Sequence, residues 1–378
     1  MSTYIVAGGS SASACLDGSS GAVLGTTTYQ IIAADPNGKY ALAWSTTDYY
    51  LRLLSLPTLA VLATGTVASA AQGWGAVFTP NGEYVIAYDG YSGVTYCYDT
   101  ATFTQQGSAS ASVLGAWPYP LSVSADSAYY AGMSATGLEV LSIPTLSAIS
   151  GSGAATQFFG QSQLLAWLTA TTGVMSGGQP FSVSGGSLSL SSDYLATSNY
   201  MPLGYTAIWA DATTGTAYGD GWGTRTHLST TYIYQGYVYG PYPPTSAGES
   251  ASSILTFNND TTSQDGIASV ADSVNHGIVT ADQTKGIVAR FNAATATVTQ
   301  VTLANSNVLA IDPTCTTIYV ANGTALYSGP ASLSSTPASF ATLSFLPSAL
   351  FVTAVPASTF VASPVAVYSQ AVNRASRY

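Results

Sequence analysis

The feature that most constrains the fold is a short phrase that occurs twice along the chain. The tripeptide Pro-Asn-Gly begins at Pro36 and again at Pro80, and each time a β-prone run follows it. Proline presets φ for a turn, and Asn-Gly supplies the positive φ that a tight turn requires. The tyrosine that opens the following run recurs at Tyr40, Tyr84 and Tyr129, so the spacing is 44 and then 45 residues. The phrase predicts a repeated strand–turn–strand unit.

A repeat of this length and content is typical of a propeller blade of four strands. We therefore predict an all-β fold, a single β-propeller of about eight four-stranded blades, with seven as the main alternative. The regular stretches of the chain predict strands at 4–8, 14–17 and 22–25; 30–34, 40–45, 50–55 and 60–64; 75–79, 84–88, 93–98 and 102–107; 119–124, 128–133, 137–142 and 146–151; and, as second strands of later units, 276–280 and 318–321.

The first unit lacks one strand, because the N-terminus matches only the last three strands of the next unit. A ring can close when strands from both termini complete one sheet, which removes the exposed sheet edges. The C-terminal region is therefore expected to supply the missing strand, with strands between 343 and 372 that include 365–370. One domain then spans 1–378 and ends in a short tail at 373–378.

The middle third, residues 155–260, repeats less regularly. Residues 164–169, 194–198 and 232–235 are expected to be, or to start, the second strands of their units. An insertion at 236–253 breaks the repeat after the last of these. Insertions in repeat folds often lie on a binding face, so this segment is a candidate for contact with another molecule.

Several segments resemble the YVTN-type repeat, which belongs to the WD-repeat-like β-propellers. Residues 79–85 and 93–102 are similar to its turn, its Tyr-Val strand and its Asp-Thr-Ala-Thr strand end. Residues 318–323 are similar to its signature, and residues 289–295 resemble its third strand and turn. The resemblance implies a propeller fold and a surface or extracytoplasmic setting. It implies no reaction, because the family includes surface proteins and enzymes.

Charge excludes several classes of partner. Charged residues make up 6% of the chain, and the formal net charge is −10 with seven Lys and Arg. Such a chain has no electrostatic footprint for nucleic acid and no polybasic patch for anionic membranes. It also has no apolar run long enough for a transmembrane helix, and its N-terminus does not resemble a signal peptide. We expect a surface of hydroxyl and amide groups and no membrane insertion.

No catalytic set is predicted. The two histidines, His227 and His276, stand in no nucleophile motif, and no phosphate loop or dinucleotide fingerprint is present. We therefore expect no enzymatic activity, no metal and no cofactor. Cys15 and Cys97 lie in strand-like runs and are expected to be buried free thiols. Aspartates that recur in the predicted turns are expected to bond their own backbone two residues on, namely Asp35, Asp126, Asp272 and Asp312.

Aromatic residues give two candidate binding groups. Trp74, Trp117 and Trp222 each precede a predicted innermost strand, and Tyr29 is expected to join them. One interpretation is that these residues lie on one face of the ring and offer flat aromatic surfaces to a glycan or a partner chain. The alternative is that their side chains pack between neighbouring blades. The second group lies in and after the segment 232–235 and comprises Tyr234, Tyr237, Tyr239 and Tyr242. Tyrosine is enriched at interfaces, so we expect either an intermolecular contact or a local hairpin on its own blade.

The C-terminal tail holds two of the few cations. Arg374 and Arg377 are expected either to fray in solvent or to act as a tether, because a guanidinium can engage a carboxylate through two hydrogen bonds. The partner carboxylates would belong to the same chain or to the component that carries it.

These observations lead to one functional hypothesis with two alternatives. The leading one is a non-enzymatic structural or recognition propeller on the exterior of a large assembly, with a virion preferred. Its partners would be other subunits of that assembly or a host-surface glycan or receptor, and its location would be the virion surface or the extracellular space. An extracytoplasmic lactonase-like enzyme is the first alternative and requires a carboxylate and histidine cluster with a metal. A cellular surface adhesin is the second.

Overall fold

The structure is a computed structural model that describes most residues between Thr3 and Ala354. Outside the description lie residues 1–2, 46, 68–73, 90–91, 111–121, 134–136, 154–164, 176–179, 192–203, 212–215, 228–229, 243–252, 259–266, 273, 275–276, 284–285, 293–294, 296, 305 and 355–378, and strand residues between 204 and 258 are described by their backbone.

The described residues form eight antiparallel sheets of four strands each. The first two sheets in chain order are β1 (Thr3–Gly8), β2 (Ser13–Asp17) and β3 (Val23–Thr27) with β32 (Ala349–Ala354), and β4 (Gln30–Ala34), β5 (Tyr40–Trp44), β6 (Tyr50–Ser55) and β7 (Val61–Val67). The next two are β8 (Trp74–Phe78), β9 (Tyr84–Asp89), β10 (Val94–Asp99) and β11 (Gln105–Ala109), and β12 (Ser122–Val123), β13 (Tyr129–Met133), β14 (Leu138–Ser142) and β15 (Ser147–Ala148).

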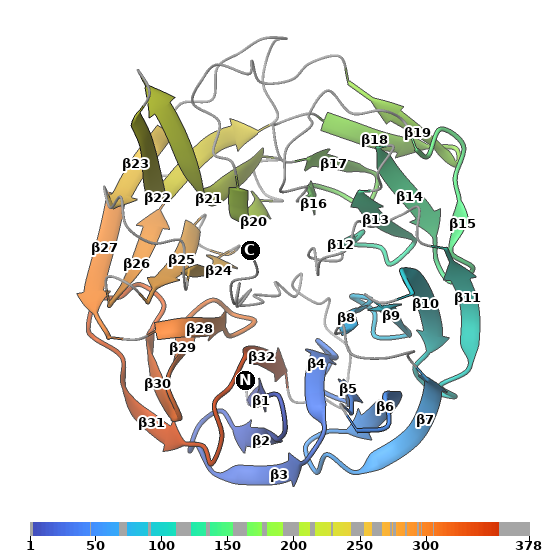
Figure 1. The fold of residues 1–378 in the computed structure, drawn as a ribbon, viewed down its shortest axis with the longest axis horizontal. Coiled ribbons are helices and arrows are strands. Elements are labelled where there is room, and N and C mark those ends of the chain that lie inside the picture. Colours follow the sequence, from blue (N-terminus) through green and yellow to red (C-terminus); the bar gives the residue numbers. More distant parts are fainter. Residues whose placement is uncertain are drawn as a thin grey trace.

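The remaining four sheets follow the same order. They are β16 (Leu165–Trp167), β17 (Thr172–Met175), β18 (Pro180–Ser184) and β19 (Ser187–Leu190); β20 (Gly204–Asp211), β21 (Thr216–His227), β22 (Thr230–Tyr242) and β23 (Ser253–Asn258); β24 (Ile267–Asp272), β25 (Gly277–Asp282), β26 (Ile287–Asn292) and β27 (Thr297–Thr302); and β28 (Ser306–Ile311), β29 (Thr317–Asn322), β30 (Ala325–Pro330) and β31 (Ala338–Thr342). The sheets are arranged around a common centre, with the first strand in chain order innermost in seven of them and β32 innermost in the sheet that also contains β1, β2 and β3 (Figure 1).

One sheet combines strands from distant regions of the chain, as the sequence predicts. β1 pairs antiparallel with β32, so that Val6 lies opposite Phe351, and β2 and β3 follow outward. Three strands of this sheet come from the N-terminal region, and the fourth comes from the C-terminal region. The supplying strand is β32, whereas the predicted strand 365–370 lies outside the described residues.

The regular units agree with the sequence, and the middle third corrects it. The strands predicted between residues 4 and 151 are present with small shifts, as are those at 276–280 and 318–321. The segment 164–169 was expected to be a second strand, but β16 is the first strand of its sheet. The segment 232–235 lies in β22, which is a third strand rather than a second. The segment 194–198 lies outside the description.

The repeated turn between first and second strands has one backbone geometry in four sheets. The fourth residue of each turn donates its N–H to the carbonyl of the first at 2.8–2.9 Å and has a positive φ. Glycine has no Cβ to oppose this conformation, yet two copies place other residues there. The four residues are Gly38, Gly82, Ser127 and Cys315.

Apolar side chains form cores between neighbouring sheets. Val6 and Cys15 from the first sheet cluster with Ile31 and Leu54 from the second, for example. Because each core is shared, every blade depends on its neighbours for burial. Cys15, Cys97 and Cys315 are buried free thiols, so the prediction for the first two is confirmed. Burial raises the pKa of Cys15 and of Cys97 to about 12, which keeps both thiols protonated.

Candidate functional site

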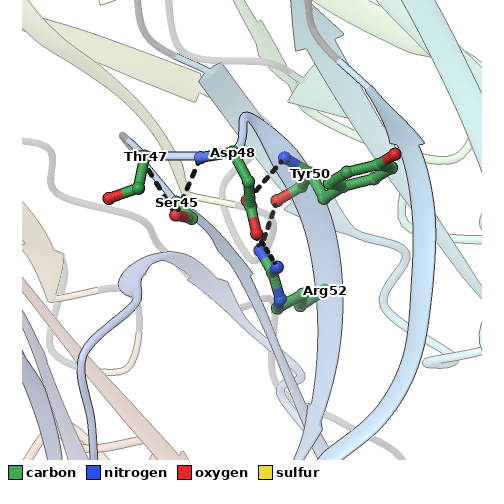
Figure 2. Close-up of polar contacts among 5 residues, drawn as sticks. All are labelled: Ser45, Thr47, Asp48, Tyr50 and Arg52. Carbon is green, nitrogen blue, oxygen red and sulfur yellow. Dashed lines mark hydrogen bonds and ion pairs between the residues drawn. The ribbon is translucent and has the colours of Figure 1, made fainter.

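The candidate site lies where the second and third strands of a sheet are joined. We call this side of the molecule the 2–3 face, and the side of the Pro-Asn-Gly turns the 1–2 face. In the sheet of β4 to β7, the turn from Ser45 to Tyr49 and the start of β6 gather an aspartate, an arginine and a tyrosine (Figure 2). Tyr29, which sequence reasoning singled out, belongs to the same cluster.

Arg52 is the centre of this cluster. Its Nη1 donates to Asp48 Oδ1 at 2.9 Å and to the carbonyl of Tyr50 at 3.2 Å, and its Nη2 pairs with Asp48 Oδ2 (Figure 2). The Arg52 side chain is only 9% exposed, whereas that of Asp48 is 42% exposed. A two-point pair of this kind fixes the carboxylate in position at the surface.

Two tyrosine rings flank the guanidinium. Its central carbon lies 4.2 Å from the centroid of Tyr29 and 5.9 Å from that of Tyr50, which is the range of cation–π attraction. Tyr29 is itself tied to β2, because Ser13 Oγ donates to its carbonyl at 2.7 Å. The cluster therefore joins the two sheets that contain β2 and β4. Tyr50 is 37% exposed, so one ring remains available at the surface.

Local hydrogen bonds shape the turn that presents Asp48. Ser45 Oγ accepts the N–H of Thr47 at 3.1 Å, and Tyr49 donates its N–H to the Ser45 carbonyl at 2.9 Å with a φ of +62°. Asp48 Oδ1 also accepts the N–H of Tyr50 at 3.2 Å. Side-chain bonds of serine and aspartate to nearby backbone are what favours a turn at this sequence.

The ion pair changes the electrostatics of both members. Hydrogen bonding to Arg52 is the main cause that lowers the pKa of Asp48 to about 2. The same bond raises the pKa of Arg52 above its usual value. Both groups therefore stay charged through the whole neutral and mildly acidic range, and the site offers a fixed carboxylate beside an aromatic ring.

Sequence reasoning missed Asp48, Tyr50 and Arg52. A signal was present, because an aspartate, two tyrosines and one of five arginines stand within five residues of a chain that is poor in charge. The contacts join the turn that contains Asp48, the third strand β6 and the connection that leads into β4 of the same sheet. The spacing of a sequence repeat does not predict contacts of this kind.

The tryptophans predicted to share one blade position do not all share it. Trp74 opens the innermost strand β8 and lies opposite Asp89. Trp222 lies in β21, a second strand, opposite Gly204, so the expected equivalence is wrong for this residue. Tyr29 directly precedes Gln30, the residue that matches Trp74 in register. Trp117 lies outside the described residues, and the binding role of this group stays a prediction.

The predicted tyrosine group lies along β22. Tyr237, Tyr239 and Tyr242 pair with β21, and the first two also pair with β23 in the four-stranded region of the sheet. Tyr234 lies beyond it, opposite Gly223, where β20 and β23 no longer pair with the hairpin. We call 223–227 and 230–234 the arm, a two-stranded extension at the 2–3 face. Some of the predicted insertion 236–253 is thus regular strand, and its residues 243–252 lie outside the description.

The aspartates expected in turns have mixed outcomes. Asp35 accepts the N–H of Asn37 at 2.9 Å and Asp312 that of Thr316 at 2.7 Å, so these carboxylates do bond nearby backbone. Asp126 accepts the N–H of Ala128 at 3.1 Å, two residues on as expected, although Ser124 and not Asp126 is the first residue of its turn. Asp272 forms an ion pair with Arg290 at 2.8 Å.

Within the described residues, no group of three or more His, Cys, Asp and Glu could hold a metal ion. Among the same residues, no helix is long and apolar enough to cross a membrane. Arg374 and Arg377 lie outside the description, so their role as a tether stays a prediction.

Comparison with known proteins identifies the fold. No family model matches the chain, and no curated protein matches its sequence. The C-terminal WD40 domain of Sif2 is similar with a TM-score of 0.58 and 10% identity, over 90% of this chain and 97% of that chain. AztD from Citrobacter koseri is similar with a TM-score of 0.57 and 9% identity, over 93% of this chain and 97% of that chain.

A third neighbour, from Bacteroides fragilis, is provisionally assigned as a 6-phosphogluconolactonase. It has a TM-score of 0.51 and 11% identity, over 80% of this chain and 96% of that chain. Likeness at such identities concerns the fold alone. Together with the four-stranded antiparallel sheets, these matches show that the chain has a WD-repeat-like β-propeller fold.

Proposed function

We propose that this propeller is a non-enzymatic recognition protein that contacts its partner through the 2–3 face. The observation that carries the proposal is the Asp48–Arg52 cluster. It presents an exposed ring, Tyr50, beside a carboxylate that a buried guanidinium holds in place. Pre-organised groups bind with a smaller loss of conformational entropy than free side chains do.

The chemistry of the cluster suits a hydroxyl-rich partner. A flat ring packs against the apolar face of a sugar, and a fixed carboxylate accepts hydrogen bonds from hydroxyl groups. A surface glycan is therefore the ligand that the cluster fits best. A protein subunit that presents hydroxyl side chains is the other partner of this kind, and the experiment below separates the two.

The described carboxylates support a recognition role over catalysis. Asp35 and Asp312 bond turn backbone, while Asp48 and Asp272 are paired with arginines. Asp35, Asp272 and Asp312 are 0–6% exposed and are held by structural contacts, whereas the pair with Arg52 leaves the Asp48 carboxylate 42% exposed and able to accept hydrogen bonds from a ligand. The lactonase-like alternative is supported by likeness of fold to the neighbour from Bacteroides fragilis.

A glycan array with purified protein tests the site. We expect Tyr50→Ser to lower binding by roughly thirtyfold, because truncation of a hot-spot aromatic costs ~2 kcal/mol. Val61→Ser is the matched control, since Val61 is 46% exposed in β7 of the same sheet but lies away from the 2–3 face. Equal binding by the two variants would contradict the proposed site. Binding to purified assemblies but to no glycan would assign a protein partner.

The tyrosines of β22 extend the same proposal. We propose that Tyr237, Tyr239 and Tyr242, with Tyr234 on the arm, contact another chain. Replacement of the first three by serine is expected to weaken assembly or attachment while circular dichroism stays unchanged. Unchanged attachment and assembly in this variant would leave β22 as an ordinary blade strand.

We also propose that the protein works on the exterior of a virion. Its composition supports this setting, since only 6% of residues are charged and the surface must be built from hydroxyl, amide and aromatic groups. Mass spectrometry of purified particles, before and after mild protease treatment, tests it. The protein should be present and lose peptides from its surface turns. Its absence from particles, with recovery from the cell surface, would favour an adhesin.

A further inference from the structure

The chain contains three Asn-Gly dipeptides that share a local sequence chemistry but differ in structure. They begin at Asn37, Asn81 and Asn322. In such a dipeptide the backbone nitrogen of glycine can attack Cγ of asparagine, because glycine has no side chain to hinder its approach. A bond forms between this nitrogen and Cγ, the Cγ–Nδ2 bond breaks, and ammonia leaves. Water then opens the cyclic imide to isoaspartate or aspartate.

Two of the three dipeptides are held in the repeated turn of the 1–2 face. Gly38 donates its N–H to the carbonyl of Asp35 at 2.9 Å, and Gly82 donates to that of Thr79 at 2.8 Å. The attacking nitrogen is therefore engaged in both. Each hydrogen bond must break before the ring can form, which slows the reaction.

The side-chain amides of these two dipeptides are also held. Asn37 Nδ2 donates to Asp35 Oδ1 at 3.2 Å. Asn81 Oδ1 accepts from Thr79 Oγ1 at 2.6 Å and from the Glu83 N–H at 3.1 Å, and its Nδ2 donates to Glu83 Oε2 at 2.9 Å. Rotation of the amide toward the glycine nitrogen would break these bonds as well.

The third dipeptide has neither restraint. Asn322 ends β29 and Gly323 lies in the two-residue turn to β30, at the 2–3 face. Gly323 is exposed, has a φ of +59° and leaves open space around the position of a Cβ. Within the described stretches of the chain, neither the Gly323 N–H nor the Asn322 side-chain amide takes part in a hydrogen bond.

We propose that Asn322 is a site of spontaneous deamidation, and that Asn37 and Asn81 are protected by their turns. The reaction adds one negative charge to the 2–3 face of a chain whose net charge is already −10. It needs no enzyme and no co-reactant other than water. An aged preparation therefore becomes a mixture of charge forms that differ on the face where we place recognition.

Incubation of the native protein at mildly alkaline pH tests the assignment. Ion exchange should resolve a growing acidic form, and peptide mapping should place isoaspartate and aspartate at 322. We expect Asn322 to react at least about tenfold faster than Asn37 and Asn81, since each net hydrogen bond contributes on the order of 1 kcal/mol. In denaturant the three rates should become similar, which shows that the structure and not the local sequence makes the difference.

Two variants complete the test. Asn322→Gln should abolish the acidic form, because a glutamine side chain is one carbon too long for the same ring. Thr79→Val should accelerate the reaction at Asn81, because it removes the hydroxyl that holds this amide. Equal rates at the three positions in the native protein, or a reaction confined to Asn37 or Asn81, would overturn the proposal.

Discussion

At the scale of single residues, the Arg290–Asp272 pair is the clearest case of a buried charge that depends on its partner. Arg290 donates through Nε and Nη2 to Asp272 Oδ2 at 3.0 and 2.8 Å. The two side chains are 11% and 0% exposed. Removal of one partner takes its ion-pair contact from a buried charge, which is strongly destabilising, whereas replacement of both by apolar groups of similar size is often nearly neutral.

We therefore expect Arg290→Met alone to lower the free energy of unfolding by about 3–5 kcal/mol. The double variant Arg290→Met with Asp272→Leu should recover much of this loss. Urea unfolding of the wild type, the single variant and the double variant measures both. A single variant with wild-type stability would show that the pair contributes nothing to folding.

The Asp48–Arg52 pair predicts a pH dependence at the same scale. Because the folded pKa of Asp48 is lowered to about 2, the pair contributes from above the unfolded pKa of about 4 and is lost as pH falls through about 2. The pKa of Asp17 is also lowered to about 2, so carbon NMR with assigned aspartate signals is needed, and it should place the midpoint of the Asp48 carboxyl near pH 2. In Arg52→Met this midpoint should rise toward the ordinary value. An unchanged midpoint in that variant would assign the shift to another cause.

At the scale of elements, the repeated first-to-second-strand turn is both a local fold and a contact between sheets. A Cβ on Gly82 would lie 2.6 Å from Asn37 Nδ2 and 2.8 Å from Asp35 Oδ1, which belong to the neighbouring sheet's turn. Asn37 Nδ2 also donates to the Pro80 carbonyl at 3.5 Å, and Asn81 N–H donates to Ser127 Oγ at 3.2 Å. Three consecutive turns are thus linked along the 1–2 face.

Substitution of Gly82 or Gly323 by alanine separates the energetic cost of the turn conformation from that of the contact between turns. Gly82 and Gly323 both have a positive φ, +72° and +59°, but only Gly82 has neighbours where a Cβ would stand. Gly323→Ala should cost about 1 kcal/mol for the backbone conformation alone. Gly82→Ala should cost more, because the linked turns must also move apart. Thermal unfolding compares the two, and equal losses would show that the turns do not depend on one another.

The sequence predicted elements well where turn chemistry is explicit. Pro-Asn-Gly after Asp35 and Thr79 marks both the turn and the strands beside it, because few residues satisfy those dihedral angles. Ser124 opens an equivalent turn, and its hydroxyl donates to Asp126 at 2.6 Å. Since a hydroxyl and a carboxylate can fill the same role, the aspartate alone did not mark the position. The middle third lacks such turns. Both β16 and β22 were therefore predicted to be second strands, whereas β16 is the first strand of its sheet and β22 is the third.

The candidate site was harder to predict than the fold for a different physical reason. Tyr29 was identified because it precedes an innermost strand. Its contact with Arg52 depends on how the connection before β4 packs against the third strand, β6. Its hydrogen bond with Ser13 depends on the position of the neighbouring sheet. Contacts of this kind are set by tertiary packing between repeats, which local propensity and spacing do not report.

At the scale of the whole molecule, the sheet of β32, β1, β2 and β3 connects distant regions of the chain. Val308 and Tyr319 from the β28–β31 sheet pack with Ile5 and Leu16, and Ile31 from β4 packs with Val6 on the other side. This sheet therefore covers apolar surface on two neighbours at once. Loss of β1 to β3 would expose both surfaces and the edge of β32.

Deletion of residues 1–27, which removes β1 to β3, is accordingly expected to prevent stable folding or to cause aggregation. In a repeat architecture each sheet is stabilised mainly by the interfaces with its neighbours, so two interfaces disappear together. Light scattering after size exclusion and a thermal melt measure the outcome. Val23→Ser with Leu24→Ser is the control, because these residues of β3 are 54% and 40% exposed and contribute little to either interface. The control should remain a soluble species with nearly the wild-type melting temperature. A truncated chain that is equally soluble and melts at the same temperature would mean that the remaining sheets hold one another without this connection.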